Sequence, residues 1–139
     1  MRRHVALSLG SLASILLQFQ TGCTPEPVHE DVQSLSASEA AALIESHAGD
    51  PEFVIIDVRT PGEFVTGHIA NAVNIDVLAT DFEENIAALD KAYAYFVYCA
   101  TGRRGAIATR EMLEAGFTNL YYLENGLIDW EAAGRPVVQ

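Results

Sequence analysis

The chain has 139 residues, of which half are apolar and 19% are charged. This length fits one ordinary domain and is too short for two, and the apolar content excludes an intrinsically disordered chain. The formal charge is −11 at pH 7. So acidic a surface repels phosphate backbones, which argues against binding to nucleic acid.

The first residues have the pattern of an export signal. Arg2 and Arg3 precede an apolar stretch over residues 5–19, and no acidic residue occurs before Glu26. A basic start followed by a short apolar segment is typical of a secretory signal, and the segment is shorter than a membrane-spanning helix.

The sequence around Cys23 resembles the lipobox of bacterial lipoproteins. Thr21, Gly22 and Cys23 suit that pattern, whereas Gln20 stands where an aliphatic residue is usual. The resemblance implies a signal peptide at residues 1–22, lipidation of Cys23, and an exported, periplasmic protein attached to the envelope membrane. An uncleaved leader, or cleavage nearby by the ordinary signal peptidase, is the alternative. Cleavage before Cys23 would leave six basic and 19 acidic residues, a formal charge of −13.

The segment after the signal is expected to be a tether. Residues 23–33 contain Pro and Glu without periodicity, so we place the start of the folded domain at residue 34 and its end at residue 139. Ser36 and Glu39 have the spacing of a capping box, which predicts a helix near residues 37–47.

The rest of the domain alternates between strands and helices. An apolar, β-branched run at residues 53–58 is typical of a strand buried on both faces. Such alternation at short spacing predicts an α/β domain, with a central parallel sheet and helices on both faces. The expected strands are residues 53–58, 72–75, 93–98 and 119–123, and the expected helices are residues 81–89, 106–115 and 126–133.

Cys99 directly follows the expected strand at residues 93–98. Open α/β sheets bind their ligands at this end of the strands. If Cys23 is lipidated, Cys99 is the remaining thiol, and an unpaired cysteine in an exported protein is a candidate reactive group. The alternative is that Cys99 is a small buried apolar residue.

The residues after Cys99 favour the thiolate. Gly102 lies in a short turn that opens a helix, so backbone N–H groups and the positive end of the helix dipole are directed at the sulfur. Arg103 and Arg104 add two formal charges. Together these effects activate the thiol without a neighbouring base and attract an anionic substrate.

This loop and the motifs around it resemble the rhodanese family. Cys99, Gly102 and Arg104 match the active-site loop of that family, Cys-x-x-Gly-x-Arg. The resemblance extends over about 100 residues. The further matches are Asp57, Arg59, Glu63, Phe64, Gly67, His68, Ile69, Ala72, Asn74 and Ile75 upstream, and Leu113, Gly116, Phe117, Leu120, Leu123, Gly126 and Trp130 downstream.

The resemblance implies a rhodanese-like fold and a sulfurtransferase that uses Cys99 as a persulfide-forming nucleophile. The donor would be a small anion such as thiosulfate and the acceptor a thiol or cyanide, with no cofactor and no metal. Asp57 is expected to pair with an arginine near the loop. The residues that would bind the donor are Ala100, Thr101, Gly102, Arg103, Arg104 and Gly105. The residues of a structural charge network beneath the loop would be Asp57, Arg59 and Glu63.

The spacing within the loop argues against a phosphatase. Tyrosine phosphatases carry an arginine six positions after the cysteine, where this chain has Gly105. A loop of six residues suits a terminal sulfur, whereas the seven-residue loop of related phosphatases and arsenate reductases suits a larger oxyanion. Mercaptopyruvate sulfurtransferases lack basic residues here, so Arg103 and Arg104 favour thiosulfate. A non-catalytic binding module or a persulfide carrier stays open as the alternative function.

Overall fold

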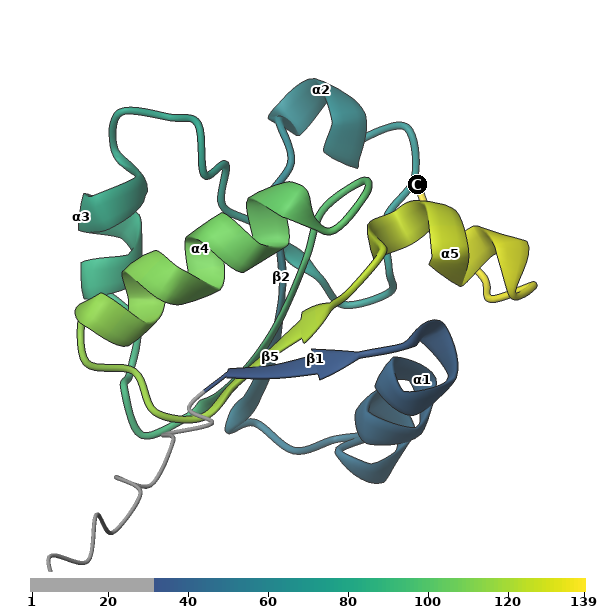
Figure 1. Cartoon of the computed structure of the whole chain (residues 1–139), viewed down its shortest axis with the longest axis horizontal. Coiled ribbons are helices and arrows are strands. Elements are labelled where there is room, and N and C mark those ends of the chain that lie inside the picture. The colour runs from purple at the N-terminus through teal and green to yellow at the C-terminus, as the bar shows by residue number, and fades with distance from the viewer. Residues whose placement is uncertain (1–31) are drawn as a thin grey trace, which may run out of the picture.

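The computed structural model describes residues 32–139. The predicted signal peptide, Cys23 and most of the predicted tether lie outside these residues. The elements, in chain order, are β1 (Val32–Leu35), α1 (Ala37–Ser46), β2 (Phe53–Asp57), α2 (Pro61–Phe64), β3 (Val73–Asn74), α3 (Phe82–Ala87), β4 (Ala94–Tyr98), α4 (Arg103–Glu114), β5 (Leu120–Leu123) and α5 (Gly126–Ala132) (Figure 1).

The five strands form one parallel sheet in the order β1-β5-β4-β2-β3. Every residue of the central strand β4 is buried, as expected for a strand covered on both faces. One apolar layer contains Ala40 of α1 and Trp130 of α5, and the other contains Ile86 of α3 and Met112 of α4. Figure 1 shows these helix pairs on opposite sides of the sheet. The predicted α/β class and its two helical layers are confirmed.

The start of the domain differs from the prediction. Val32 and Gln33, assigned above to the tether, belong to β1 and pair with β5. This edge strand exists because of pairing with a segment almost 90 residues further along the chain, so the local sequence pattern does not reveal it. In contrast, the predicted capping box of α1 is present, since Ser36 and Glu39 bond to one another through both backbone and side chain.

The helix after Cys99 starts earlier than predicted. α4 begins at Arg103 and not at residue 106, because Gly102 adopts a left-handed conformation with φ of +94° and the chain turns directly into the helix. Gly116 ends this helix with φ of +97°, as expected for a residue just past a helix C-terminus. Between residues 32 and 139, no helix is long and apolar enough to cross a membrane.

Candidate active site

Cys99 is the first residue after β4 and is fully buried. Its Sγ accepts a hydrogen bond from the Gly102 N–H at 3.1 Å. The structure therefore combines the two interpretations of this thiol: it is buried like an apolar core residue, and a backbone donor of the following turn points at its sulfur.

The loop after Cys99 presents the start of a helix to the sulfur. The first helical hydrogen bond of α4 joins the Ala106 N–H to the Gly102 carbonyl at 3.0 Å. The backbone N–H groups of Arg103, Arg104 and Gly105 lie in the first turn of α4, before this bond. They therefore have no acceptor within the helix. In the described residues, Gly102 is the one loop residue whose N–H bonds to the sulfur. The other donors are thus available to an anion that approaches the loop.

The predicted donor-binding residues differ in exposure. Gly102 and Gly105 are buried, Ala100 is partly buried, and Thr101 and Arg103 are exposed. The Arg103 guanidinium has no hydrogen-bond or ion-pair partner among residues 32–139. Within the described part of the chain nothing neutralises this charge, so it can attract an incoming anion.

Two glycines let the loop pack directly on the turn between β5 and α5. A Cβ on Gly102 would lie 1.7 Å from the Glu124 carbonyl oxygen, and a Cβ on Gly126 would lie 2.5 Å from the Ala100 carbonyl carbon. Both glycines have positive φ, +94° and +69°. Any side chain at either position would force the two backbones apart.

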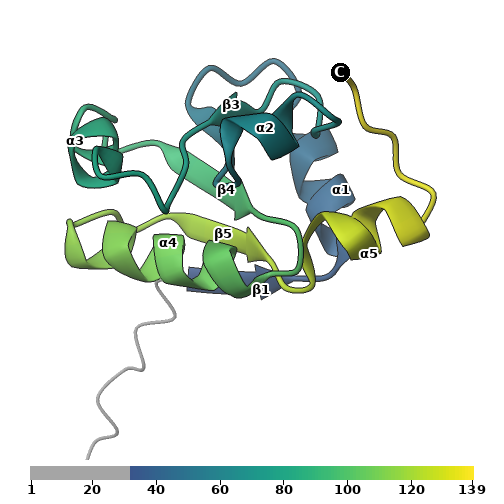
Figure 2. The same ribbon diagram turned by 90° about the horizontal axis from the view of Figure 1, so that it is seen from above.

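The first turn of α5 also bonds to the loop. The Leu127 N–H donates to the Cys99 carbonyl at 2.8 Å, and the Ile128 N–H donates to the Ala100 carbonyl at 3.1 Å. Figure 2 shows the loop between β4 and α4 next to the start of α5. The loop conformation thus depends on α5 as well as on the strand and helix that it joins.

Arg104 forms a bidentate ion pair with Glu63 of α2. Its Nη1 and Nη2 donate to the two carboxylate oxygens at 2.8 Å each. The hydrogen bonds from Arg104 lower the pKa of Glu63 to about 2. The pKa of Arg104 is raised, mainly by these bonds and to a smaller extent by Cys99 and Asp76. This pair fixes α2 against the start of α4, and Arg104 fits the role of a loop-holding residue better than that of a free cation.

Asp57 and Arg59 form a second, separate ion pair. Arg59 Nη2 donates to Asp57 Oδ2 at 2.6 Å and to the Gly67 carbonyl at 2.7 Å, and both side chains are buried. Burial by itself lowers the pKa of Arg59, but the hydrogen bonds and charge of Asp57 outweigh it and raise that pKa. Asp57 therefore pairs with Arg59 and not with a loop arginine such as Arg103 or Arg104. In place of one charge network, the structure has two separate ion pairs, Asp57–Arg59 and Glu63–Arg104.

Two further side chains hold the strand ends: Tyr98, which the sequence pattern does not single out, and Asn74, which matches a family motif but was given no role above. The Tyr98 hydroxyl accepts a hydrogen bond from the buried Ile69 N–H at 2.9 Å. Burial, with the nearby Asp57 carboxylate, raises the pKa of Tyr98. Asn74 Nδ2 donates to the carbonyls of Asp57 and Arg59 at 3.0 and 2.8 Å. The sequence feature that could have pointed to Tyr98 is its position next to Cys99, at the end of a strand predicted to be buried.

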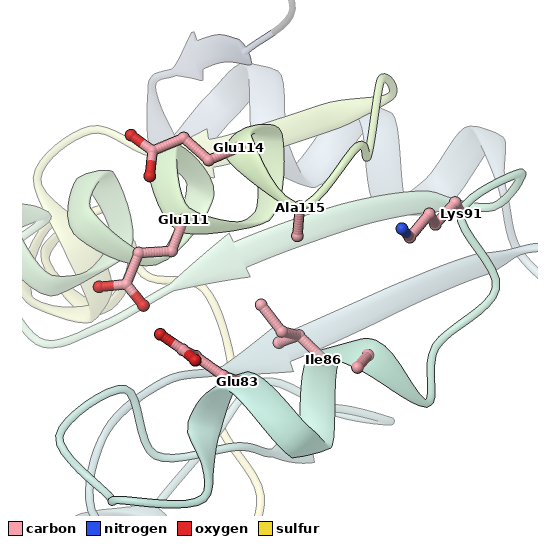
Figure 3. Close-up of a pocket in the computed structure, with 7 residues that line it drawn as sticks. Glu83, Ile86, Lys91, Glu111, Glu114 and Ala115 are labelled. Carbon is pink, nitrogen blue, oxygen red and sulfur yellow. The ribbon is translucent and has the colours of Figure 1, made fainter.

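Two hollows of the surface lie away from this loop. The first, about 300 Å³ in volume, lies between α3 and α4 and carries three glutamates on an apolar floor (Figure 3). The second, about 680 Å³, lies between the end of α1 and β2. Neither contains a residue of the 99–105 loop, and no group of three His, Cys, Asp or Glu side chains in residues 32–139 is placed to hold a metal ion. Both hollows are thus separate from the loop that carries Cys99.

Comparison with known proteins agrees with the geometry of the loop. Residues 36–133 match the rhodanese-like domain family. The chain belongs to this family. It is 30% identical over 115 residues to the thiosulfate:glutathione sulfurtransferase of Saccharomyces cerevisiae, a match that covers 75% of this chain and 81% of that protein.

Two further similar proteins differ from this chain in length or in name. The tRNA uridine(34) hydroxylase of Pectobacterium carotovorum is 32% identical over 113 residues, and the match covers 76% of this chain but only 31% of that protein. The crystal structure of a rhodanese-related protein from Thermoplasma volcanium has a TM-score of 0.64 and 30% identity, over 76% of this chain and 97% of the other. The rhodanese-like fold is thereby established for this chain.

Proposed function

We propose that this protein is a sulfurtransferase that moves a sulfane sulfur from thiosulfate, or a similar anionic donor, to a thiophilic acceptor. The observation that carries the proposal is the Cys99 sulfur held at the start of α4 by the Gly102 N–H. The name of the yeast relative, which specifies thiosulfate and glutathione, supports the same donor and a thiol acceptor.

In the first half-reaction the Cys99 thiolate attacks the outer sulfur of thiosulfate. A sulfur–sulfur bond forms to Cys99, the bond between the two sulfur atoms of thiosulfate breaks, and sulfite leaves with the electron pair. Arg103 is exposed beside the loop and would attract the doubly charged donor. The N–H groups at the start of α4 would stabilise the anionic persulfide that results.

In the second half-reaction an acceptor removes the outer sulfur. Cyanide, for example, attacks that atom and leaves as thiocyanate, while the bonding electron pair returns to Cys99 as a thiolate. The loop stabilises both the thiolate and the persulfide, because each places negative charge near the same N–H groups. The cycle consumes no proton and needs no general base.

An intact-mass measurement tests this proposal. The protein without residues 1–22 is incubated with thiosulfate, and its intact mass is measured before and after cyanide is added. We expect a gain of one sulfur atom that cyanide removes and that is absent from Cys99→Ser. No gain in mass with thiosulfate would refute this donor and leave only the family assignment.

A persulfide carrier is the second candidate, and the N–H groups at the start of α4 favour it. They would stabilise the anionic persulfide, so a loaded Cys99 would persist until a dedicated partner takes the sulfur. A persulfide that is stable for hours in excess cyanide would support the carrier, whereas rapid thiocyanate release would support the enzyme.

We also propose that the protein is exported and anchored to the bacterial envelope through Cys23. The basic and apolar pattern of residues 1–22 and the lipobox-like residues before Cys23 support this proposal. The full chain, expressed in a bacterium, should fractionate with membranes and incorporate labelled fatty acid. Cys23→Ala should abolish the labelling, and equal labelling of both proteins would refute the anchor.

A further inference from the structure

The strand β1 forms one edge of the sheet. It pairs with β5 on one side, and no strand among residues 32–139 pairs with its other side. Figures 1 and 2 show β1 as the last strand of the sheet, next to β5. Proteins commonly protect such an edge from pairing with another chain by means of charged side chains or proline. β1 has the sequence Val-Gln-Ser-Leu and carries neither.

Alternate residues of β1 direct their backbone groups away from β5. The Leu35 carbonyl accepts a hydrogen bond at 2.9 Å from the N–H of Glu124, which directly follows β5. Along a strand, a residue whose N–H and carbonyl face one neighbour alternates with a residue whose groups face the other side. Leu35 and Gln33 therefore face β5. Ser34 and Val32 direct their N–H and carbonyl groups to the open edge.

A surface hollow of about 430 Å³ lies beside this edge. It is lined by all four residues of β1 and by Glu39 of α1. One carboxylate oxygen of Glu39, Oε2, accepts the capping-box hydrogen bonds from the backbone and hydroxyl of Ser36. The other oxygen, Oε1, has no hydrogen-bond partner in the described part of the chain. The hollow thus combines outward-facing main-chain groups with one exposed carboxylate.

We propose that this edge binds an extended segment of a partner protein, which adds a strand to the sheet and places a lysine or arginine beside Glu39. An extended chain supplies N–H and carbonyl groups at the spacing of those on Val32 and Ser34. The positive charge follows from Glu39, which lines the hollow, and from the formal charge of −11 on the whole chain.

Two other occupants match the edge less well. A second copy would bring two acidic chains together, and their charges repel. The residues that precede β1 in this chain include Pro25 and Pro27, which lack the N–H group that a strand donates. They also include Glu30 and Asp31, which carry the same charge as Glu39.

Three short peptides test the edge. The first alternates valine and threonine between terminal lysines, the second is the same peptide with an N-methyl group on every valine and threonine, and the third has glutamates in place of the lysines. Each peptide carries a fluorophore, and its binding to the full chain is measured by fluorescence anisotropy. We expect the first peptide to bind about tenfold more tightly than the second, because N-methylation removes several main-chain hydrogen bonds. At low salt, it should also bind about tenfold more tightly than the third.

Ser34→Pro tests the same contact on the side of the protein. The proline removes an N–H that points away from β5, so β1 keeps its hydrogen bonds to β5. Binding of the first peptide should fall about tenfold. Ser34→Thr is the matched control, since it keeps the N–H, and it should bind like wild type. Glu39→Gln removes the charge and leaves a residue that suits the capping box, and it should reduce the preference for lysine over glutamate.

Several results would overturn the proposal. Equal binding of the first two peptides, or undiminished binding to folded Ser34→Pro, would show that the edge does not pair with a strand. If Ser34→Pro does not fold, the methylated peptide and Glu39→Gln decide the question. A dimer that Ser34→Pro abolishes would assign the edge to a second copy, and peptide binding that appears only after removal of residues 1–22 would assign it to that segment. None of these measurements depends on the chemistry of Cys99, so failure of the proposed function would leave them unchanged.

Discussion

Replacing Glu63 by glutamine would test whether the Glu63–Arg104 ion pair holds the active loop. The variant keeps the size of the side chain and removes its charge. A lowering of the Glu63 pKa from 4.5 to about 2 corresponds in full to roughly 3 kcal/mol of stability. Because the Glu63 side chain is 37% exposed, solvent screens the pair, and we expect a loss of about 1–1.5 kcal/mol at pH 7.

The pH dependence of this loss has a definite sign. A carboxylate with a lowered folded-state pKa stabilises the fold fully above its unfolded-state pKa, near 4.5, and loses that contribution as the pH falls towards 2. Urea unfolding at pH 7 and pH 3 should therefore show a difference between wild type and Glu63→Gln that shrinks by about half or more at pH 3.

The same variant should also slow the loading of Cys99. With Arg104 released, we expect loading by thiosulfate to fall about tenfold or more, because small displacements of a reacting group have effects of that size. Glu84→Gln is the control, since Glu84 is exposed and has no hydrogen-bond partner among residues 32–139. An equal deficit in stability at pH 3 and pH 7, or wild-type loading with the pair removed, would refute the reasoning.

Four further substitutions, one of them a control, probe separate parts of the site. Arg103→Ala should raise the KM for thiosulfate about tenfold with little change in kcat, and an unchanged KM in steady-state assays would remove Arg103 from the donor path. Gly126→Ala should lower the free energy of unfolding by about 2–4 kcal/mol and abolish loading, because its Cβ would lie 2.5 Å from the loop backbone. Gly105→Ala, whose Cβ would have no neighbour closer than 3.8 Å, should behave like wild type in both measurements. Tyr98→Phe should cost about 1–3 kcal/mol in urea unfolding, because the buried Ile69 N–H loses its acceptor; full stability would show that water replaces the hydroxyl.

The elements with strong local patterns are those that the sequence predicts correctly. The apolar run of β2, the fully buried β4 and the capping box of α1 each depend on neighbouring residues, and each lies where the pattern places it. β1 depends on pairing with β5 far along the chain, so no local pattern could show it. The helix start at Arg103 depends on the left-handed turn at Gly102, which is a property of the folded loop.

In the candidate site, too, the features that depend on neighbouring residues were predicted and those that depend on distant contacts were not. The position of Cys99 at the end of a buried strand and before a helix follows from the sequence, and the structure agrees. The choice of ion-pair partners does not follow, since Glu63 and Arg104 are 41 residues apart and meet only because α2 folds back over α4. The contact between the loop and Gly126 also joins residues that are distant in sequence.

The bonds from α5 to the loop bear on how the protein is made. Synthesis proceeds from the N-terminus, so Cys99 is present well before residues 126–128 exist. Until then the Cys99 and Ala100 carbonyls lack the Leu127 and Ile128 donors that hold them in the structure. A growing or truncated chain therefore contains Cys99 without the α5 hydrogen bonds that fix its loop. Reactivity of the thiol should appear only when the C-terminal part of the domain has folded into place.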